Sequence, residues 1–155
     1  MKKIYKLIIA LLIPQLAGGL GSLFTASSVK GWYTTIQKAP LNPPGWIFGP
    51  VWTTLFLMMG YALYIVWISE DKAKKTLAYV AFTIQLTLNV FWSVVFFGLK
   101  NPGLAFAEIL ILWLAIIFNI FIFYRISRTS AWLLVPYLLW VTFAAYLNYS
   151  IWILN

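Results

Sequence analysis

The chain has 155 residues, of which 63% are hydrophobic and 9% are charged, and its formal net charge is +8. Together with a mean hydropathy of +0.91, this composition excludes a water-soluble fold, because a domain of this size could not bury so much apolar surface. The sequence has no Cys and no His, which excludes disulfides, thiolate chemistry and imidazole ligation, and we expect neither a bound metal nor a resident cofactor.

Five apolar segments are long enough to cross a bilayer, whose core of about 30 Å requires about 20 helical residues. They cover residues 5–25, 46–68, 76–98, 103–124 and 130–153. Runs such as 109–118 are apolar on all sides, whereas the strands of a membrane β-barrel would alternate polar and apolar residues. The sequence therefore predicts an all-α integral membrane protein, a single domain of residues 1–155 built as a five-transmembrane-helix bundle.

The first segment also resembles a secretory signal peptide. Lys2, Lys3 and Lys6 precede its apolar stretch, and small residues follow at 26–28. The apolar stretch continues to about Phe24, however, which is long enough to span the membrane. We therefore expect this segment to be retained as the first helix.

The connection between the first and second helices, residues 26–45, is much longer than the others. It carries two adjacent aromatic residues, Trp32 and Tyr33, and three prolines, Pro40, Pro43 and Pro44. Prolines restrict the backbone, and long loops in compact domains are usually lids or binding loops. We expect an ordered lid here, although Trp32 and Tyr33 also fit a simpler role as interfacial anchors.

The third helix carries amides and aromatic residues on one face. These are Gln85, Asn89, Trp92, Ser93 and Phe96, which follow the spacing of successive helical turns. An amide that faced lipid would lack a hydrogen-bond partner, so this face is expected to turn toward the other helices.

The fourth helix contains Glu108, the one charged residue that lies inside an apolar run, where an ionised group costs about 2.5 kcal/mol or more. Leu112, Ala115 and Asn119 continue the same face. Glu108 and Asn119 either form hydrogen bonds to neighbouring helices or take part in ligand handling. No hydrolytic site accompanies them, because the chain offers no His, no paired carboxylates and no Ser beside a plausible base.

The fifth helix places large flat side chains beside a small one. Steps of four residues connect Trp132, Pro136, Trp140, Ala144, Asn148 and Trp152. Such a stripe suits a slot for a planar ligand, and the alternative is tight helix packing. Close packing is also the natural interpretation of small residues in the first helix, namely Ala17, Gly18, Gly21, Ser22 and Thr25.

The cations are divided unequally between the two sides of the membrane. Eight lie on the side of the N-terminus: Lys2, Lys3, Lys6, Lys72, Lys74, Lys75, Arg125 and Arg128. Three lie on the other side: Lys30, Lys38 and Lys100. The positive-inside rule predicts a cytoplasmic N-terminus and an external C-terminus. These small clusters form no basic face for nucleic acid, and membrane lipid headgroups are the expected counter-charge.

Several motifs, taken in order, resemble the TspO/MBR family of tryptophan-rich sensory proteins, which is related to the mitochondrial translocator protein. The resemblance begins with Trp32-Tyr33 and Lys38 and continues through the stretch from Asn42 to Thr53, NPPGWIFGPVWT. It continues at Gln85 to Asn89, Trp92-Ser93, Phe96-Phe97-Gly98, Ala105, Glu108, Leu112-Trp113, Ala131 to Leu134, Pro136-Tyr137, Trp140, Phe143-Ala144 and Leu147-Asn148. Because it covers nearly the whole chain, it is far more specific than any single motif.

The resemblance implies a five-helix bundle, often a homodimer in a bacterial cell membrane, with a pocket beneath the first loop. The family binds porphyrins such as protoporphyrin IX and haem, and its mitochondrial branch binds cholesterol and benzodiazepine-type drugs. Carried over by position, the pocket would be lined by Tyr33, Pro43, Pro44, Phe48, Trp52, Phe56, Asn89, Trp92, Trp140, Ala144 and Asn148. Some bacterial members are reported to degrade protoporphyrin in light and oxygen, and the tryptophans linked to that activity match Trp52 and Trp140.

Two departures from the family pattern affect what is carried over. Ala39-Pro40-Leu41 stands where many members have Pro-x-Trp, so the loop contacts of that Trp are missing. No basic residue follows Tyr149, so the sterol motif of animal members is absent. Any haem bound here would also lack the usual axial His.

We expect first a tetrapyrrole-binding sensor or receptor, in which Lys38 and the amides of Asn42 and Asn89 are available for the propionates of the ligand. A light-dependent porphyrin-degrading enzyme that uses Trp52 and Trp140 is the second hypothesis. A transporter of porphyrin or lipid is the third, although the chain shows no inverted repeat.

Overall fold

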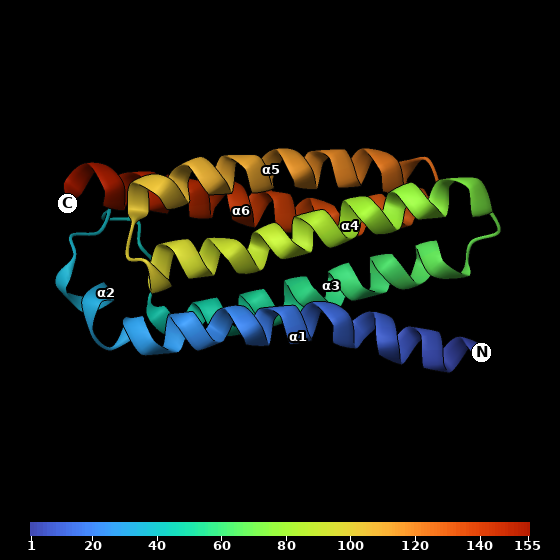
Figure 1. Ribbon diagram of the computed structural model, residues 1–155, viewed down its shortest axis with the longest axis horizontal. Coiled ribbons are helices and arrows are strands. Elements are labelled where there is room, and N and C mark those ends of the chain that lie inside the picture. Colours follow the sequence, from blue (N-terminus) through green and yellow to red (C-terminus); the bar gives the residue numbers. More distant parts are fainter.

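The computed structural model describes residues 1–155 and confirms the predicted all-helical fold (Figure 1). Its five long helices are all apolar and long enough to span a membrane. In chain order the elements are α1 (Lys3–Val29), α2 (Trp32–Thr35), the 3₁₀ turn η1 (Gly45–Ile47), α3 (Phe48–Ile68), α4 (Lys72–Ser93), the π-helical turn η2 (Val94–Gly98), α5 (Pro102–Tyr124) and α6 (Arg128–Leu154).

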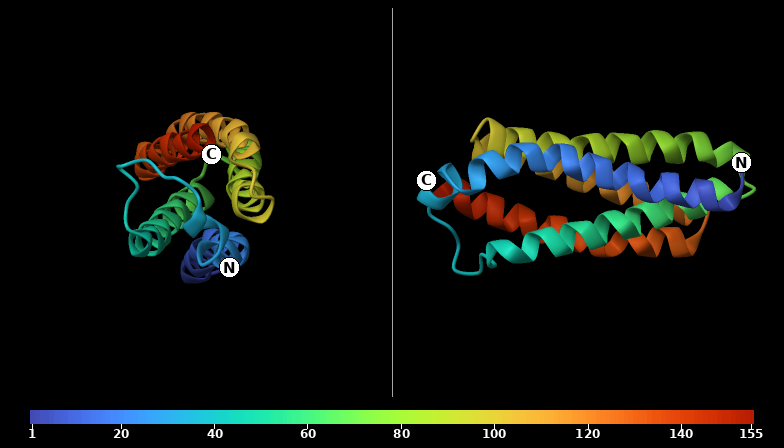
Figure 2. Two further views of the ribbon diagram at one scale, coloured as in Figure 1. Left: turned by 90° about the vertical axis from the view of Figure 1, so that its left-hand side faces the viewer. Right: turned by 90° about the horizontal axis from the view of Figure 1, so that it is seen from below.

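The five long helices form a ring in the order α1, α3, α6, α5, α4, with α4 returning to α1. Although α3 and α4 follow each other in the chain, they touch little, because α1 lies between them on one side of the bundle (Figure 2). The N-terminus lies at the end that carries the α3–α4 and α5–α6 connections, and α2 lies near the C-terminus at the other end (Figure 1).

Helices α4, α5 and α6 begin before their predicted starts, because polar residues that precede the apolar runs cap them. Helix α3, in contrast, begins at Phe48, two residues after its predicted start. Asp71 accepts a hydrogen bond from the backbone N–H of Lys74 at 3.3 Å, so α4 begins at residue 72 and not at 76. The Asn101 side-chain oxygen caps α5 by accepting a hydrogen bond from the Leu104 N–H at 3.0 Å, and Pro102 occupies the first turn. The Lys74 side chain also binds the Asp71 carboxylate at 2.8 Å, and its hydrogen bond holds the pKa of Asp71 below the usual range.

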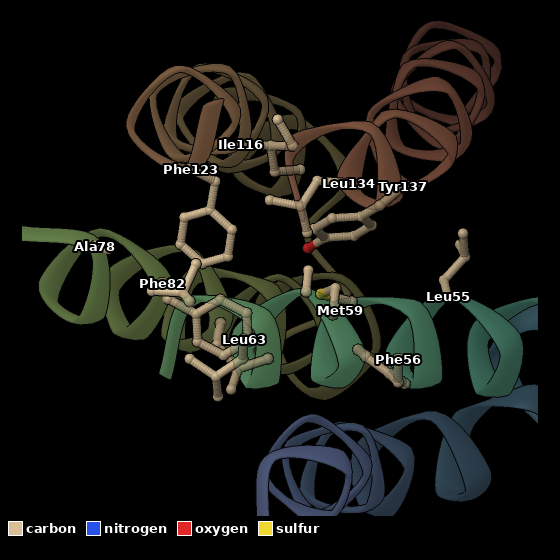
Figure 3. Packing of buried hydrophobic residues seen from close by; sticks show 14 of the residues in the cluster. Leu55, Phe56, Met59, Leu63, Ala78, Phe82, Ile116, Phe123, Leu134 and Tyr137 are labelled. Atoms are coloured by element: carbon tan, nitrogen blue, oxygen red, sulfur yellow. The ribbon is translucent and has the colours of Figure 1, made fainter. Parts of the chain in front are cut away.

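The core lies toward the N-terminal end of the bundle, where α3, α4, α5 and α6 meet (Figure 3). Phe82 and Phe123 stack there with ring centroids 6.0 Å apart, and both are buried. Tyr137 and Met59 are fully buried nearby, and the Gln85 amide donates to the Met59 sulfur at 3.8 Å. This packing leaves the opposite end of the ring free to open around a cavity.

Helix α4 ends in a π-helical turn and not in a regular α-helical one. In η2 the Leu99 N–H bonds to the Val94 carbonyl at 2.8 Å, five residues back. Ser28 at the end of α1 donates to the Phe97 carbonyl at 2.6 Å, which ties α1 to this turn. The wider turn brings Phe96 and Phe97 together beneath α2.

Candidate functional site

A cavity of about 330 Å³ lies between α1, α3, α4 and α6, beneath the loop that joins α1 to α3. It is lined by 21 residues, 12 of them hydrophobic, and it is not fully enclosed. Its volume falls at the lower end of the range for small-molecule sites, about 300–1,000 Å³. Apolar walls with few polar groups suit a hydrophobic ligand.

Most of the residues predicted for the pocket do line this cavity. They are Tyr33, Phe48, Trp52, Phe56, Asn89, Trp92, Trp140, Ala144 and Asn148. Pro43 and Pro44 do not line it, because they lie in the extended segment that leads into η1. These two prolines shape the loop backbone and contribute no cavity wall.

One wall of the cavity comes from α1, which the sequence did not predict as part of the pocket. Gly18, Gly21, Ser22, Thr25 and Val29 line it. Four of these had been interpreted only as close-packing positions, and close packing is also present: a Cβ added at Gly18 would lie 2.3 Å from the Phe56 ring. The remaining unpredicted lining residues are Gly45, Gly49, Ser93, Phe96, Phe97, Leu147 and Ile151.

Aromatic rings from α3 and α6 meet at one side of the cavity. Trp52 stacks on Phe56 with ring centroids 5.5 Å apart, and it meets Trp140 edge to face at 6.5 Å. Trp140 also contacts Phe48 at 5.9 Å, and Tyr137 lies behind Trp52 at 6.2 Å. Such interlocked rings form a rigid surface on which a flat ligand can stack.

The cavity's two amides are already committed to the protein. Asn148 accepts from the Trp92 indole N–H at 2.9 Å and donates to the Pro102 carbonyl at 2.7 Å, so it fixes the Trp92 ring and joins α4, α5 and α6. Asn89 donates to the Tyr137 hydroxyl at 2.8 Å. The indole N–H of Trp140 is also buried, and it has no protein partner.

Polar groups of the loop gather around Tyr33. Its hydroxyl donates to the Asn42 side-chain oxygen at 3.3 Å, and the Lys38 ammonium lies 4.5 Å from its ring centroid. Burial raises the pKa of the Tyr33 phenol, while the Asn42 hydrogen bond lowers it in part. The phenol therefore remains neutral at ordinary pH, and Lys38 supplies the positive charge at this end.

The loop forms an ordered lid that is held near its start and at its middle. Trp32 and Tyr33 pack against Phe96 with ring centroids 5.7 and 6.4 Å apart, so they bind the lid to η2 in addition to any interfacial role. The Asn155 side chain accepts from the Gln37 N–H at 2.9 Å and donates to the Gln37 carbonyl at 3.0 Å. This paired contact fastens the middle of the loop to the end of α6.

Two tryptophans of the predicted α6 stripe do not belong to the slot. Trp132 is 66% exposed and Trp152 is 49% exposed, and neither lines the cavity. Each step of four residues turns about 40° around a helix of 3.6 residues per turn, so a long stripe cannot keep one direction. Only its middle part, Trp140, Ala144 and Asn148, faces the ligand cavity.

Glu108 and Asn119 face inward as predicted, but they make neither of the predicted contacts. Both are buried, both side chains lack hydrogen-bond partners, and neither lines the cavity. A buried polar group without a partner costs about 1–3 kcal/mol. The α5 face that carries them is therefore a source of instability.

Replacing Glu108 with Leu is accordingly expected to stabilise the protein by about 1–3 kcal/mol, because it removes two unpaired buried oxygens while keeping a similar volume. Thermal unfolding in detergent measures the effect as a raised Tm. Glu70→Gln, which removes a charge from an exposed residue, is the control and should leave the Tm unchanged. A lower Tm for Glu108→Leu would show that the carboxyl has a stabilising partner.

The chain is similar to known proteins over nearly its whole length. The model of the TspO/MBR family matches residues 10–153. The chain is 42% identical over 155 residues to the tryptophan-rich protein TspO of Chlorobaculum tepidum, covering 99% of this chain and 98% of that protein. It is 42% identical over 156 residues to the TspO of Archaeoglobus fulgidus, covering 98% of each. The human translocator protein is 37% identical over 143 residues, covering 91% of this chain and 85% of that protein.

Proposed function

Because the chain belongs to the TspO/MBR family and is an integral membrane protein, we propose that it is a receptor or sensor for tetrapyrroles such as protoporphyrin IX. One observation carries the proposal: the intramembrane cavity has interlocked tryptophans on one side and a wall of small residues on the other. A flat apolar ligand gains free energy when it leaves water for such a site.

The shape of the cavity supports a planar ligand. Gly18, Gly21 and Ser22 keep the α1 wall of the cavity low, while Trp52 and Trp140 supply flat rings from α3 and α6. A macrocycle can therefore stack on these rings beside a wall of small residues. Because the cavity is not fully enclosed, a ligand larger than its volume can project through the opening.

Polar groups of the lid are available to the propionates of a porphyrin. Its propionates would lie at the lid, where Lys38 and the Tyr33 hydroxyl are near the cavity rim. Asn42 is close to this edge, whereas one N–H of Asn89 is already donated to the Tyr137 hydroxyl.

Titration of the purified protein in detergent with protoporphyrin IX tests the proposal. We expect saturable quenching of tryptophan fluorescence, because the ligand would lie against Trp52 and Trp140. Trp140→Phe should weaken binding about tenfold through loss of indole surface against the ligand. Trp132→Phe is the matched control, since Trp132 lies outside the cavity and should leave the affinity unchanged. Absence of saturable quenching would refute the proposal.

The proposal includes a topology and an assembly. With the N-terminus on the cytoplasmic side of a cell membrane, as the excess of cations at that end indicates, the end of the bundle that carries the lid faces outward. A reporter fused after Asn155 that is active only in the cytoplasm would contradict this orientation. A homodimer is proposed on the resemblance to the family alone.

A second candidate function rests on the direct contact between Trp52 and Trp140. Indoles that meet at 6.5 Å, with Tyr137 6.2 Å from Trp52, are close enough to pass single electrons. In light-dependent breakdown the porphyrin would be oxidised, molecular oxygen would be the electron acceptor, and the rings would relay electrons. Equal product formation by wild type and a Trp52→Phe/Trp140→Phe double variant with porphyrin bound would exclude this role.

A further inference from the structure

A second hollow lies in the other half of the bundle, where α1, α3 and α4 converge. Its volume is about 330 Å³, and it is lined by Ile13, Leu63, Trp67, Tyr79, Phe82 and Thr83. Leu63 and Phe82 are buried and close its base, whereas Ile13 and Thr83 are exposed. The hollow is therefore a groove that opens sideways between α1 and α4, and it is called the α1–α4 groove below.

The opening of the α1–α4 groove lies within the depth of the membrane. Helix α3 ends at Ile68 and α4 begins at Lys72, so Trp67 marks the membrane edge. Thr83 lies 11 residues along α4 from Lys72, or about 16 Å deeper. An opening at this depth faces lipid chains and not water. Hydrocarbon is therefore the natural occupant.

Two ammonium groups stand at the outer end of the groove. The Lys6 Nζ lies 5.9 Å from the centroid of the Trp67 ring, and the Lys75 Nζ donates to the Trp67 carbonyl at 2.7 Å. Lys6 is two helical turns from Ile13, and Lys75 is one turn from Tyr79, so each cation shares a helix face with a groove residue. Neither forms a salt bridge, since the only one in the chain joins Lys74 to Asp71.

From this arrangement we infer that the α1–α4 groove binds an anionic glycerophospholipid. One acyl chain lies in the groove against Leu63 and Phe82, and the phosphate lies between Lys6 and Lys75 beside Trp67. The two cations at this end of the groove match a headgroup that carries net negative charge, while Asp71 nearby is paired with Lys74. A zwitterionic lipid adds a choline cation that this end of the groove does not accommodate.

Native mass spectrometry of the protein in detergent tests the assignment with phosphatidylglycerol and phosphatidylcholine of identical acyl chains. We expect tighter retention of phosphatidylglycerol, and we expect a Lys6→Gln/Lys75→Gln double variant to bind it about 30-fold more weakly. The matched control is Lys2→Gln/Lys72→Gln, which removes the same charge from exposed residues at the same end. That control should retain phosphatidylglycerol like the wild type.

Two further measurements separate chain binding from headgroup binding. Thr83→Phe fills the rim of the groove without changing charge, and it should lower retention of both lipids while the Tm stays unchanged. Excess glycerol 3-phosphate, which has the headgroup chemistry but no chain, should fail to displace the lipid. The inference is overturned if both lipids are retained equally, if the control double variant loses as much affinity as the groove variant, or if glycerol 3-phosphate displaces the lipid.

Discussion

Replacing Ala144 with Phe is expected to weaken porphyrin binding by at least about 100-fold, or about 3 kcal/mol, while the helix bundle remains folded. Ala144 lies one helical turn from both Trp140 and Asn148, and all three line the cavity. A phenyl ring at this position would occupy space that the ligand is proposed to fill. Because it enters an existing cavity, it should leave the Tm unchanged or raise it.

Absorbance titration with protoporphyrin IX measures this loss, and Ala107→Phe is the matched control. Ala107 is exposed on the outer face of α5, so the same substitution there adds an aromatic ring to the lipid-facing surface only. The control should bind porphyrin like the wild type. If Ala144→Phe also kept the wild-type affinity, the ligand would have to bind elsewhere on the protein.

The five helices and the inward face of α4 could be predicted from sequence because lipid imposes a strong constraint. Every backbone polar group must be satisfied within a helix, and an amide such as Gln85 or Asn89 must turn toward protein. Both residues are indeed buried. The resemblance to the family then predicted nine of the 21 lining residues, including Trp52, Trp140 and Ala144.

The α1 wall of the cavity could not be predicted, because small residues serve two purposes that look identical in a sequence. Gly18 permits the close approach of Phe56, and it also borders the cavity. Whether a small residue packs against a neighbouring helix or borders a cavity depends on the side chain opposite it. The sequence of one helix does not show which side chain that is. The π-helical turn at Val94–Gly98 is hidden for the same reason, since its hydrogen bonds depend on local packing.

The hydrogen-bond partners of the buried polar residues could not be predicted from the sequence. Asn148 was predicted to line the site, and it does, but its amide also accepts from Trp92 and donates to the Pro102 carbonyl. Glu108 was predicted either to hydrogen-bond to a neighbouring helix or to take part in ligand handling. Its oxygens have no hydrogen-bond partner in the chain, and it does not line the cavity. Burial can be inferred from a helical face, whereas a hydrogen-bond partner depends on distances of a few tenths of an ångström.

Helices α1 and α3 are in close backbone contact where Gly60 of α3 meets Ala10 of α1. A Cβ added at Gly60 would lie 2.6 Å from the Ala10 carbonyl oxygen and 2.7 Å from the Leu11 Cα. Pro14, one turn after Ala10, has no N–H and cannot donate to that carbonyl. The bare Gly60 backbone thus packs against a carbonyl that lacks its usual helical donor.

Gly60→Ala is therefore expected to destabilise the protein by about 2–3 kcal/mol and to lower its Tm, although Ala is the better helix former. The clash involves backbone atoms of α1 and cannot be relieved by a change of rotamer, so α1 must move away from α3. Gly19→Ala is the matched control: its Cβ would meet no atom within 4 Å, and it should leave the Tm unchanged or raise it slightly. Since α1 also supplies a cavity wall, Gly60→Ala should weaken porphyrin binding as well. Equal melting temperatures for the two variants would mean that α1 and α3 are not held in this close contact.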